Sequence, residues 1–246
     1  MHRFFIDKKD IKMDSIIITG EDVQHITKVL RLKIDDVIVL CDGEGVDYYA
    51  AIKDMDKHIV KTKILRKEYT NTEPTIKVVL YQGIPKGAKM DTIVQKCIEL
   101  GVNRIVPVVN ARNVVKLSDE QNIRKKIERW QRIAIEAAKQ CRRGIIPIID
   151  RPKEFKDALE EAATLDLAIM PYEMDQNNPL KDAIHGKNIR EIGIFIGPEG
   201  GYENSEVIAA LNKGVITVTL GPRILRTETA GIAVLSCLMY EFDEMR

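Results

Sequence analysis

The sequence lacks the features of a secreted or membrane-bound protein. Its four cysteines lie far apart and form no CxxC pair, which argues against a zinc site or a disulfide framework and favours a reducing compartment. No apolar run approaches the roughly 18 residues of a membrane span, and the N-terminal MHRFFIDKKD is too short and too charged for a signal peptide. We therefore expect a cytoplasmic protein with no membrane partner and with buried cysteines, namely Cys41, Cys97, Cys141 and Cys237.

Motifs of several common enzyme classes are also absent. The chain has no GxGxxG after its first α/β strand and no GxxxxGK[ST], which disfavours an NAD enzyme and a P-loop NTPase. It has neither HExxH nor GxSxG. The four histidines form no ligand cluster, so we expect no metal; they are His2, His25, His58 and His185.

The formal net charge of +1 conceals an uneven distribution of charged residues. Residues 77–151 contain 16 Lys and Arg against 7 Asp and Glu, whereas residues 152–246 contain 9 against 16. Residues 1–72 are balanced, with 13 of each sign. A basic middle segment predicts a surface that binds a polyanion. The alternative is that solvated helix faces differ in sign by chance.

The N-terminal part shows short β-type runs separated by turn signals, which predict a small antiparallel barrel. The expected strands lie at 15–19, 36–41, 48–54 and 58–65. A helical pattern at 21–30 interrupts them, with Val23, Ile26, Val29 and Leu30 facing inward. The polar, proline-containing stretch at 70–75 predicts a domain boundary. We therefore expect one domain at 1–72 and a second domain at 73–246.

From Ile76 onward, apolar runs alternate with helical patterns, which predicts a parallel sheet with helices on both faces. The expected strands lie near 76–82, 104–109, 145–149, 166–170, 191–197 and 215–220. The expected helices lie near 88–100, 119–141, 154–163, 204–213 and 228–243. Ligands of open parallel sheets bind at the carboxyl ends of the strands, so we expect the binding site there.

Two glycine-proline turns follow two of these apolar runs and are expected to lie side by side. One is Gly197-Pro198-Glu199-Gly200-Gly201, and the other begins at Leu220-Gly221-Pro222. Glycines allow a backbone to approach a ligand closely, and proline stiffens a turn. The turns could instead only reverse the chain. The candidate ligand-binding residues are Met170, Gly197, Pro198, Glu199, Gly200, Gly201, Leu220, Gly221, Ile224, Leu225 and Arg226.

Basic residues at helix ends and loops are candidate contacts for RNA phosphates. The helical pattern near 119–141 has one apolar stripe, on which Trp130 is expected to be packed, and its other faces are basic. Positive charge also suits a helix C-terminus, which is the simpler explanation for Arg31 and Lys33. The candidates are Arg3, Arg31, Lys33, Lys86, Arg112, Arg142 and Arg143, with His2 and Lys116 as further possibilities.

The paired motifs GPEGG at 197–201 and LGPRILRTETA at 220–230 resemble the RsmE-type ribosomal RNA methyltransferases of the SPOUT superfamily. KMDTIVQKCIELGV at 89–102 is similar to another segment of that family, and HITKVLRLK and CDGEG in the N-terminal part match it less specifically. The resemblance implies a PUA-like, RNA-binding barrel at 1–72 followed by a trefoil-knotted parallel-sheet methyltransferase domain at 73–246. It implies that S-adenosylmethionine binds at the two turns, where Leu220, Ile224 and Leu225 would line the adenine and Glu199 would accept from a hydroxyl.

The resemblance also implies an activity and partners. Members of this family transfer a methyl group to N3 of a uridine in 16S ribosomal RNA of the small subunit. They form homodimers with the active site near the interface, for which the last helix would supply Leu235, Leu238, Met239 and Tyr240. In this chain Arg226 could stabilise a uracil oxyanion and Glu228 could accept the proton. Their simpler roles are an ion pair and a favourable first-turn carboxylate.

Two other functions are compatible with the residues alone. One is a non-catalytic RNA-binding protein with the same basic surface, which would bind RNA without a saturable cofactor. The other is a small-molecule enzyme of the doubly wound class that uses another nucleotide cofactor, which would ignore RNA and salt.

Overall fold

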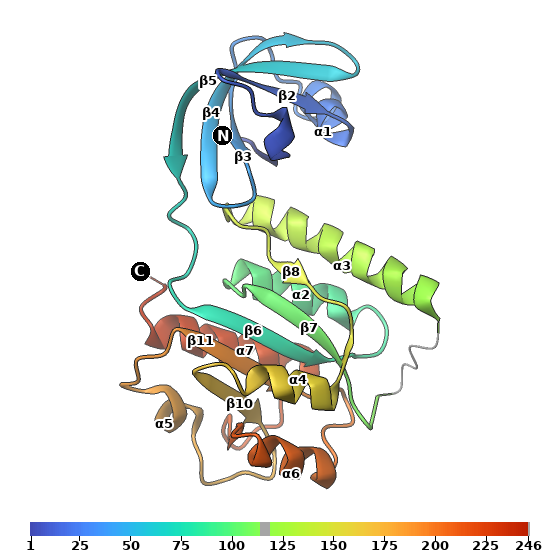
Figure 1. Ribbon diagram of the computed structural model, residues 1–246, viewed down its shortest axis with the longest axis vertical. Coiled ribbons are helices and arrows are strands. Elements are labelled where there is room, and N and C mark those ends of the chain that lie inside the picture. Colours follow the sequence, from blue (N-terminus) through green and yellow to red (C-terminus); the bar gives the residue numbers. More distant parts are fainter. Residues whose placement is uncertain (114–118, 246) are drawn as a thin grey trace. The chain divides into compact units, whose positions relative to one another are not determined.

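The computed structural model describes residues 1–113 and 119–245, and the chain divides into two compact units (Figure 1). The first, here called the β unit, comprises Met1–Glu73 and Ala138–Ile146. The second, here called the α/β unit, comprises Pro74–Ala137 and Pro147–Arg246. Within the described ranges no helix is long and apolar enough to cross a membrane.

The β unit contains a five-stranded sheet in the order β1-β3-β4-β5-β2. The strands are β1 (Arg3–Phe5), β2 (Ser15–Thr19), β3 (Val37–Cys41), β4 (Val46–Met55) and β5 (Ile59–Tyr69). Four of the five strands were expected, and their mutual pairings are antiparallel. The expectation of a wholly antiparallel arrangement was wrong, because β1 pairs with β3 in parallel. Three residues are too few for the periodicity that reveals a strand.

The expected helix of the β unit changes its winding halfway. It consists of α1 (Glu21–Gln24) and a π-helical turn, η2 (His25–Val29), and a short 3₁₀ helix, η1 (Lys8–Asp10), precedes β2. Val23 and Ile26 are buried as expected, but Val29 is 69% exposed. A π turn contains more residues than an α turn. Leu30, one residue later, therefore packs against the core.

A second chain segment, residues 138–146, completes the β unit, which the sequence pattern did not predict. The carboxylate of Glu73 accepts hydrogen bonds from Arg143 Nη2 at 2.6 Å and from the backbone N–H groups of Gly144 and Ile145 at 2.9 and 3.1 Å. Arg143 is 2% exposed. A Cβ on Gly144 would lie 2.0 Å from Thr70 Cγ2, so only glycine fits where the two segments meet.

The α/β unit is built around a parallel sheet in the order β12-β10-β11-β6-β7-β8, with β9 also paired with β7. All of its pairings are parallel, which confirms the predicted sheet. Its strands are β6 (Lys77–Gly83), β7 (Arg104–Val109), β8 (Ile148–Ile149), β9 (Lys153–Glu154), β10 (Leu167–Pro171), β11 (Glu191–Ile196) and β12 (Ile216–Val218). The helices that connect them are α2 (Lys89–Glu99), α3 (Glu120–Gln140), α4 (Phe155–Ala162), α5 (Leu180–Ile184) and α6 (Asn204–Asn212). The last helix, α7 (Thr227–Glu241), follows β12.

Helices cover both faces of this sheet. Figure 1 shows α2 and α7 packed together on one face and α4 and α6 on the other. In the core, the rings of Tyr81 and Phe195 stack with their centroids 4.5 Å apart, and Phe155 meets Phe195 edge-on. Trp130 is 5% exposed, which confirms that it is packed. Leu235, Leu238 and Met239 of α7 are also buried inside the unit.

An ion-pair network links β7 to α4. Arg104 pairs with Asp150 and with Glu161, and Lys153 and the hydroxyl of Tyr81 also donate to the Glu161 carboxylate. Burial raises the pKa of Glu161. The hydrogen bonds from Arg104, Lys153 and Tyr81 outweigh this effect and lower its pKa from 4.5 to about 2. A carboxylate with a lowered pKa stabilises the fold above its unfolded-state pKa, and this stabilisation is lost as the pH falls towards the folded-state pKa.

We expect Glu161→Gln to lower the free energy of unfolding at neutral pH by on the order of 1 to 2 kcal/mol, allowing for solvent screening. The wild type should lose this difference between about pH 4.5 and pH 2, so that the two proteins converge in acid. Urea unfolding at several pH values measures this.

The control is Glu160→Gln on the same helix, where the partner Lys213 and Glu160 itself are 40% and 51% exposed. Its cost should be smaller, because exposed ion pairs contribute little. A constant difference between wild type and Glu161→Gln down to pH 2 would contradict this role of Glu161.

Candidate functional site

The two glycine-proline turns lie at the same edge of the sheet but are separated by a strand. β11 and β12 both pair with β10 and not with one another, so the turns flank the carboxyl end of β10. The expectation that they lie side by side was therefore wrong in detail. Because the pairings are parallel, the carboxyl ends of β6, β10, β11 and β12 all meet at this edge.

The first turn is held tightly against its neighbours. The hydroxyl of Thr227 donates to the carbonyl of Gly197 at 2.6 Å, and the N–H of Gly201 donates to the carbonyl of Pro198 at 2.9 Å. A Cβ on Gly83 would lie 2.6 Å from Pro198 N, so glycine at the end of β6 permits this approach. Gly201 has a φ of 66°, a conformation that favours glycine.

The Gly200 carbonyl and the Glu199 carboxylate of this turn also contact neighbouring segments of the α/β unit. Arg112 Nη1 donates to the carbonyl of Gly200 at 3.0 Å. The Glu199 carboxylate accepts from the backbone N–H of Lys86 at 3.1 Å and pairs with Lys89 Nζ at 3.0 Å. Arg112 and Glu199 therefore shape the turn, in addition to any contact with RNA or a ligand.

Lys89 connects the two carboxylates of the site. Its Nζ lies 3.0 Å from Glu199 Oε1 and 3.3 Å from Glu228 Oε2. The hydrogen bond to Glu199 raises the pKa of Lys89. Burial raises the pKa of Glu199, but the hydrogen bonds from Lys89 and from backbone N–H groups more than offset it and lower the pKa. Both groups are therefore charged at neutral pH.

The second loop presents apolar groups to solvent. Ile224 is 86% exposed, whereas Leu220 and Leu225 are half-buried and Arg226 is exposed. Gly221 has a φ of 94°, which accounts for glycine at this turn. Met170 at the end of β10 is fully buried and packs in the core. Any ligand contact at this position must therefore involve its backbone.

Buried oxygen atoms without a described hydrogen-bond donor gather near this edge. They are Gln82 Oε1, Asn110 Oδ1 and Asn113 Oδ1. Gln82 lies at the end of β6, and the two asparagines follow β7. Buried acceptors are normally satisfied, so their clustering indicates a site that a polar ligand completes.

The sequence patterns missed Gln82, Lys89, Asn110 and Thr227. Gln82 is a polar residue at the end of an apolar strand, which was a usable signal. Lys89 begins α2, and nothing in the spacing distinguished it from Lys86.

The candidate phosphate contacts differ in accessibility. Arg31, Lys33, Lys86, Arg112 and Arg142 are exposed. In contrast, Arg3 and Arg143 do not present their guanidinium groups to solvent. Arg3 is bound by both oxygens of Asp47, with its side chain 10% exposed, and Arg143 by Glu73. These two residues stabilise the β unit, which is why we exclude them from the RNA surface. His2 is exposed, and Lys116 lies outside the described residues.

No cluster of three or more metal-ligating side chains occurs in residues 1–113 and 119–245. None of the four cysteines forms a disulfide bond. Cys41 and Cys97 are buried as expected, whereas Cys141 is half-buried and Cys237 is exposed, contrary to expectation. Burial raises the pKa of Cys41 to about 11 and that of Cys97 to about 12, so neither is a thiolate nucleophile.

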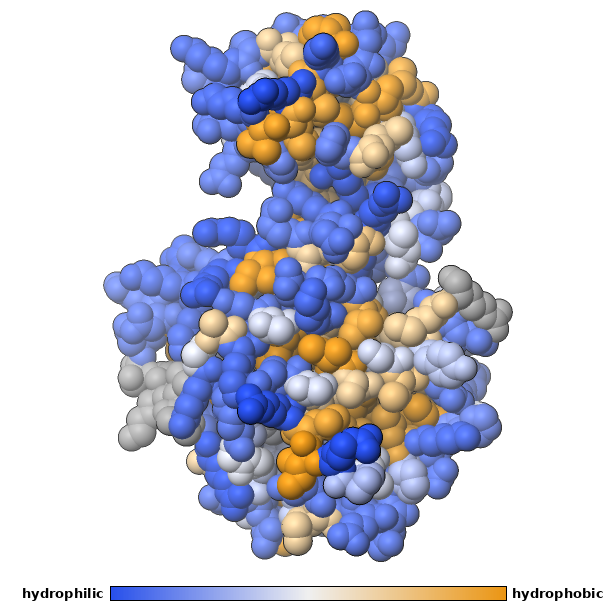
Figure 2. Space-filling model, turned by 180° about the vertical axis from the view of Figure 1, so that it is seen from behind, coloured by the Kyte–Doolittle hydropathy of each residue, from blue (hydrophilic) through white to orange (hydrophobic). Residues whose placement is uncertain are grey.

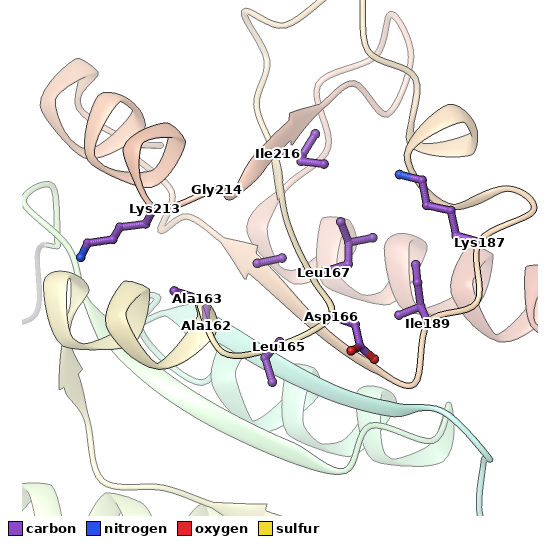
Figure 3. Close-up of a pocket in the computed structure, with 11 residues that line it drawn as sticks. Ala162, Ala163, Leu165, Asp166, Leu167, Lys187, Ile189, Lys213, Gly214 and Ile216 are labelled. Carbon is purple, nitrogen blue, oxygen red and sulfur yellow. The ribbon is translucent and has the colours of Figure 1, made fainter.

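A cavity of about 360 Å³ lies at the opposite edge of the sheet (Figure 3). It is formed at the amino ends of β10 and β12 and is lined mainly by alanine, leucine and isoleucine, with Asp166, Lys187 and Lys213 at its border. It contains none of the candidate site residues.

The contacts of Glu199 give a testable result. In Lys89→Met the pKa of Glu199 should rise, because the largest of the effects that lower it is removed and burial remains. In the control Lys86→Met it should stay unchanged, because Lys86 reaches Glu199 only through its backbone N–H. Carboxyl-detected NMR titration measures both values. Equal shifts in the two variants would contradict the contacts described.

Comparison with known proteins places these features in a family. A family model described as an RNA methyltransferase domain matches residues 71–239, and one described as an RNA methyltransferase PUA domain matches residues 18–65. The protein named ribosomal RNA small subunit methyltransferase E of Bacillus subtilis (strain 168) is 35% identical, with 100% of this chain and 99% of that protein covered. Its namesake from Mesomycoplasma hyopneumoniae (strain 232) is also 35% identical, with 96% and 98% covered.

Solved structures agree over nearly the whole chain. A crystal structure of a ribosomal RNA small subunit methyltransferase E from Neisseria gonorrhoeae, bound to S-adenosyl methionine, has a TM-score of 0.87 and 31% identity over 98% of this chain and 97% of that one. A chain from Legionella pneumophila, in complex with the bound cofactor SAM, has a TM-score of 0.87 and 31% identity, with 97% and 96% covered. The predicted combination of a PUA-like unit and a parallel-sheet α/β unit is confirmed, and the chain belongs to the RNA methyltransferase family whose members include the ribosomal RNA small subunit methyltransferases E.

Proposed function

We propose that this protein uses S-adenosylmethionine to methylate N3 of a uridine in 16S ribosomal RNA of the small subunit. The observation that carries the proposal is the edge where β6, β10, β11 and β12 end, with its two turns and its buried acceptors. Family membership and the cofactor in the solved relatives support the same reading. Such a substrate places the protein in the cytoplasm.

The residues at this edge fit the chemistry of that cofactor. Its adenine needs an apolar surface, which the exposed Ile224 and the half-buried Leu220 and Leu225 offer. Its ribose and amino-acid end need polar partners. The buried acceptors near β6 and β7 and the backbone of residues 197–201 supply them. Gly200 and Gly221 lack a side chain that would cover the turns.

When bound, the cofactor supplies a methyl group on a sulfonium, and the C–S bond breaks as the new N–C bond forms. The protein orients the base and removes the N3 proton. In this proposal the Glu228 carboxylate accepts that proton, and Arg226 stabilises negative charge on a uracil oxygen. Lys89, 3.3 Å from Glu228 Oε2, orients the carboxylate. The reacting base must be unpaired to reach the site.

RNA binding is assigned to the domain at 1–72 and to exposed cations of the domain at 73–246. The proposed phosphate contacts are Arg31, Lys33, Lys86, Arg112 and Arg142, all of which are exposed. Arg142 adjoins Arg143, whose ion pair with Glu73 fixes the segment. Affinity carried by such contacts should fall with salt, because each phosphate contact releases counterions.

We also propose a homodimer through α7 and a trefoil-knotted chain. Helix α7 has apolar residues on every side, a pattern that is typical of a helix buried all round. Nevertheless Ile232, Ala233, Ser236, Cys237 and Tyr240 form a face that is exposed or half-buried, and Tyr240 is 77% exposed. Figure 2 shows hydrophobic side chains on this side of the α/β unit. Of the four residues first expected at the interface, only Tyr240 is available to a partner, because the other three are buried in the unit.

The knot is supported by the path of the chain. β10 precedes both β11 and β12 in sequence and yet lies between them in the sheet. After β12 the chain returns to β11, where Thr227 donates to Gly197.

The test is transfer of labelled methyl from S-adenosylmethionine to small subunits and to naked 16S RNA, followed by nucleoside analysis. We expect N3-methyluridine in at least one substrate. Glu228→Gln should lower kcat by on the order of 100-fold, because a general base is lost. Glu160→Gln, on the surface of α4 and away from this edge, is the control and should stay active.

Two results would contradict the proposal. RNA binding without any methyl transfer would favour a non-catalytic RNA-binding protein. Saturable cofactor binding by a protein that does not bind RNA at any salt concentration would favour a small-molecule enzyme.

A further inference from the structure

The inference begins at Gln82, a fully buried glutamine near the end of β6. It lies opposite Ile196, the last residue of β11, in the parallel ladder. Its Nε2 donates to Thr227 Oγ1 and to the carbonyl of Gly83, each at 2.9 Å. The orientation of the amide follows from these contacts, because the opposite orientation would place Oε1 against the carbonyl oxygen of Gly83.

Thr227 extends this contact to the first turn. Its Oγ1 donates to the carbonyl of Gly197 at 2.6 Å. A hydroxyl has one hydrogen, and a carbonyl can only accept. The Thr227 hydroxyl therefore gives its hydrogen to Gly197 and accepts from Gln82. The result is a directed chain of hydrogen bonds from Gln82 through Thr227 to Gly197, in which Gln82 is 0% and Thr227 is 7% exposed.

This chain joins both loops of the site to the sheet. Gly197 is the first residue of the turn at 197–201, and Thr227 begins α7 directly after the loop at 220–226. The Gly197–Pro198 peptide is planar, so a fixed carbonyl also fixes the ring of Pro198. Gly83 packs closely against that peptide, because a Cβ at this position would lie only 2.6 Å from Pro198 N.

We propose that Gln82 and Thr227 are positioning residues for the cofactor. They hold the turn at 197–201 and the loop at 220–226 at the separation that S-adenosylmethionine requires, through the hydrogen bonds of Gln82 Nε2 and of the Thr227 hydroxyl. This inference rests on the proposed function. The strands and α7 are held by their own backbone hydrogen bonds, whereas the Thr227 and Gln82 side chains join the two loops to the sheet. Loss of the chain should therefore weaken ligand binding more than it perturbs the fold.

The experiment compares Thr227→Val, which keeps the shape but lacks the hydroxyl, with Thr227→Ser, which retains it. Calorimetric titration with S-adenosylmethionine should show a Kd raised by about 10-fold or more for Thr227→Val, because a buried donor and a buried acceptor lose their partner. Thr227→Ser should stay within about threefold of wild type. In methyl transfer, KM for the cofactor should rise in Thr227→Val, and KM for RNA should not.

Gln82→Met tests the other end of the chain and replaces Thr227→Val if that variant fails to fold. Its Kd should rise similarly. The double variant Gln82→Met/Thr227→Val should have a Kd at most about threefold above that of the single variant that binds less tightly. The effects of two residues in one hydrogen-bond network are not additive.

The matched control removes a hydrogen bond at the amino end of β6, the end opposite to Gln82. Asn103 Oδ1 accepts from the N–H of Val78 at 2.7 Å. Asn103→Ala should lower the melting temperature and leave the Kd unchanged. A wild-type Kd in folded Gln82→Met or Thr227→Val would overturn the inference. So would a Kd that rises as much in Thr227→Ser or in Asn103→Ala as it does in Thr227→Val. Absence of binding to the wild type itself, with and without RNA, would contradict the proposed function, and this inference with it.

Discussion

The site depends on one close contact, the packing of the Gly197–Pro198 peptide against Gly83 at the end of β6. It is possible because β6 and β11 pair in parallel and end together, and because Gly83 has no side chain. From this contact the turn projects over the edge of the sheet, where Thr227, Lys86, Lys89 and Arg112 secure its polar groups. The second loop is positioned through Thr227. The geometry of both loops thus follows from the parallel sheet and from a few contacts that need glycine.

The sequence predicted those parts of the fold that repeat over several residues. The long apolar runs of β6, β7, β10 and β11 and the stripes of α2 to α4 were identifiable, because burial imposes a period on them. The elements β1, β9 and α5, with three, two and five residues, showed no such period and were not predicted. The segment at 138–146 escaped prediction for a different reason. It is held by Glu73, some 70 residues earlier, through a buried ion pair that no local pattern reveals.

The site was predictable to a similar extent. Glycine and proline are visible in a sequence, so both turns were identified together with their place at the strand ends. Gln82 and Thr227 were not, because their importance comes from the partner that each meets across the sheet. Charge was the least reliable guide. Arg3 and Arg143 resemble exposed phosphate contacts in sequence, but their carboxylate partners are non-local and occupy them. Exposure of Ile224 and of one face of α7 was likewise evident only in the folded chain.

The central claim is that the turn at 197–201 holds the cofactor. Calorimetric titration of S-adenosylmethionine into the wild type and into Gly200→Arg tests it most directly, with the fold of both checked by circular dichroism. A Cβ at position 200 would already lie 3.2 Å from Arg112 Cβ, so a large side chain must displace Arg112 or cover the turn. The account predicts saturable binding to the wild type and none to a folded Gly200→Arg. Equal binding to both proteins would contradict it.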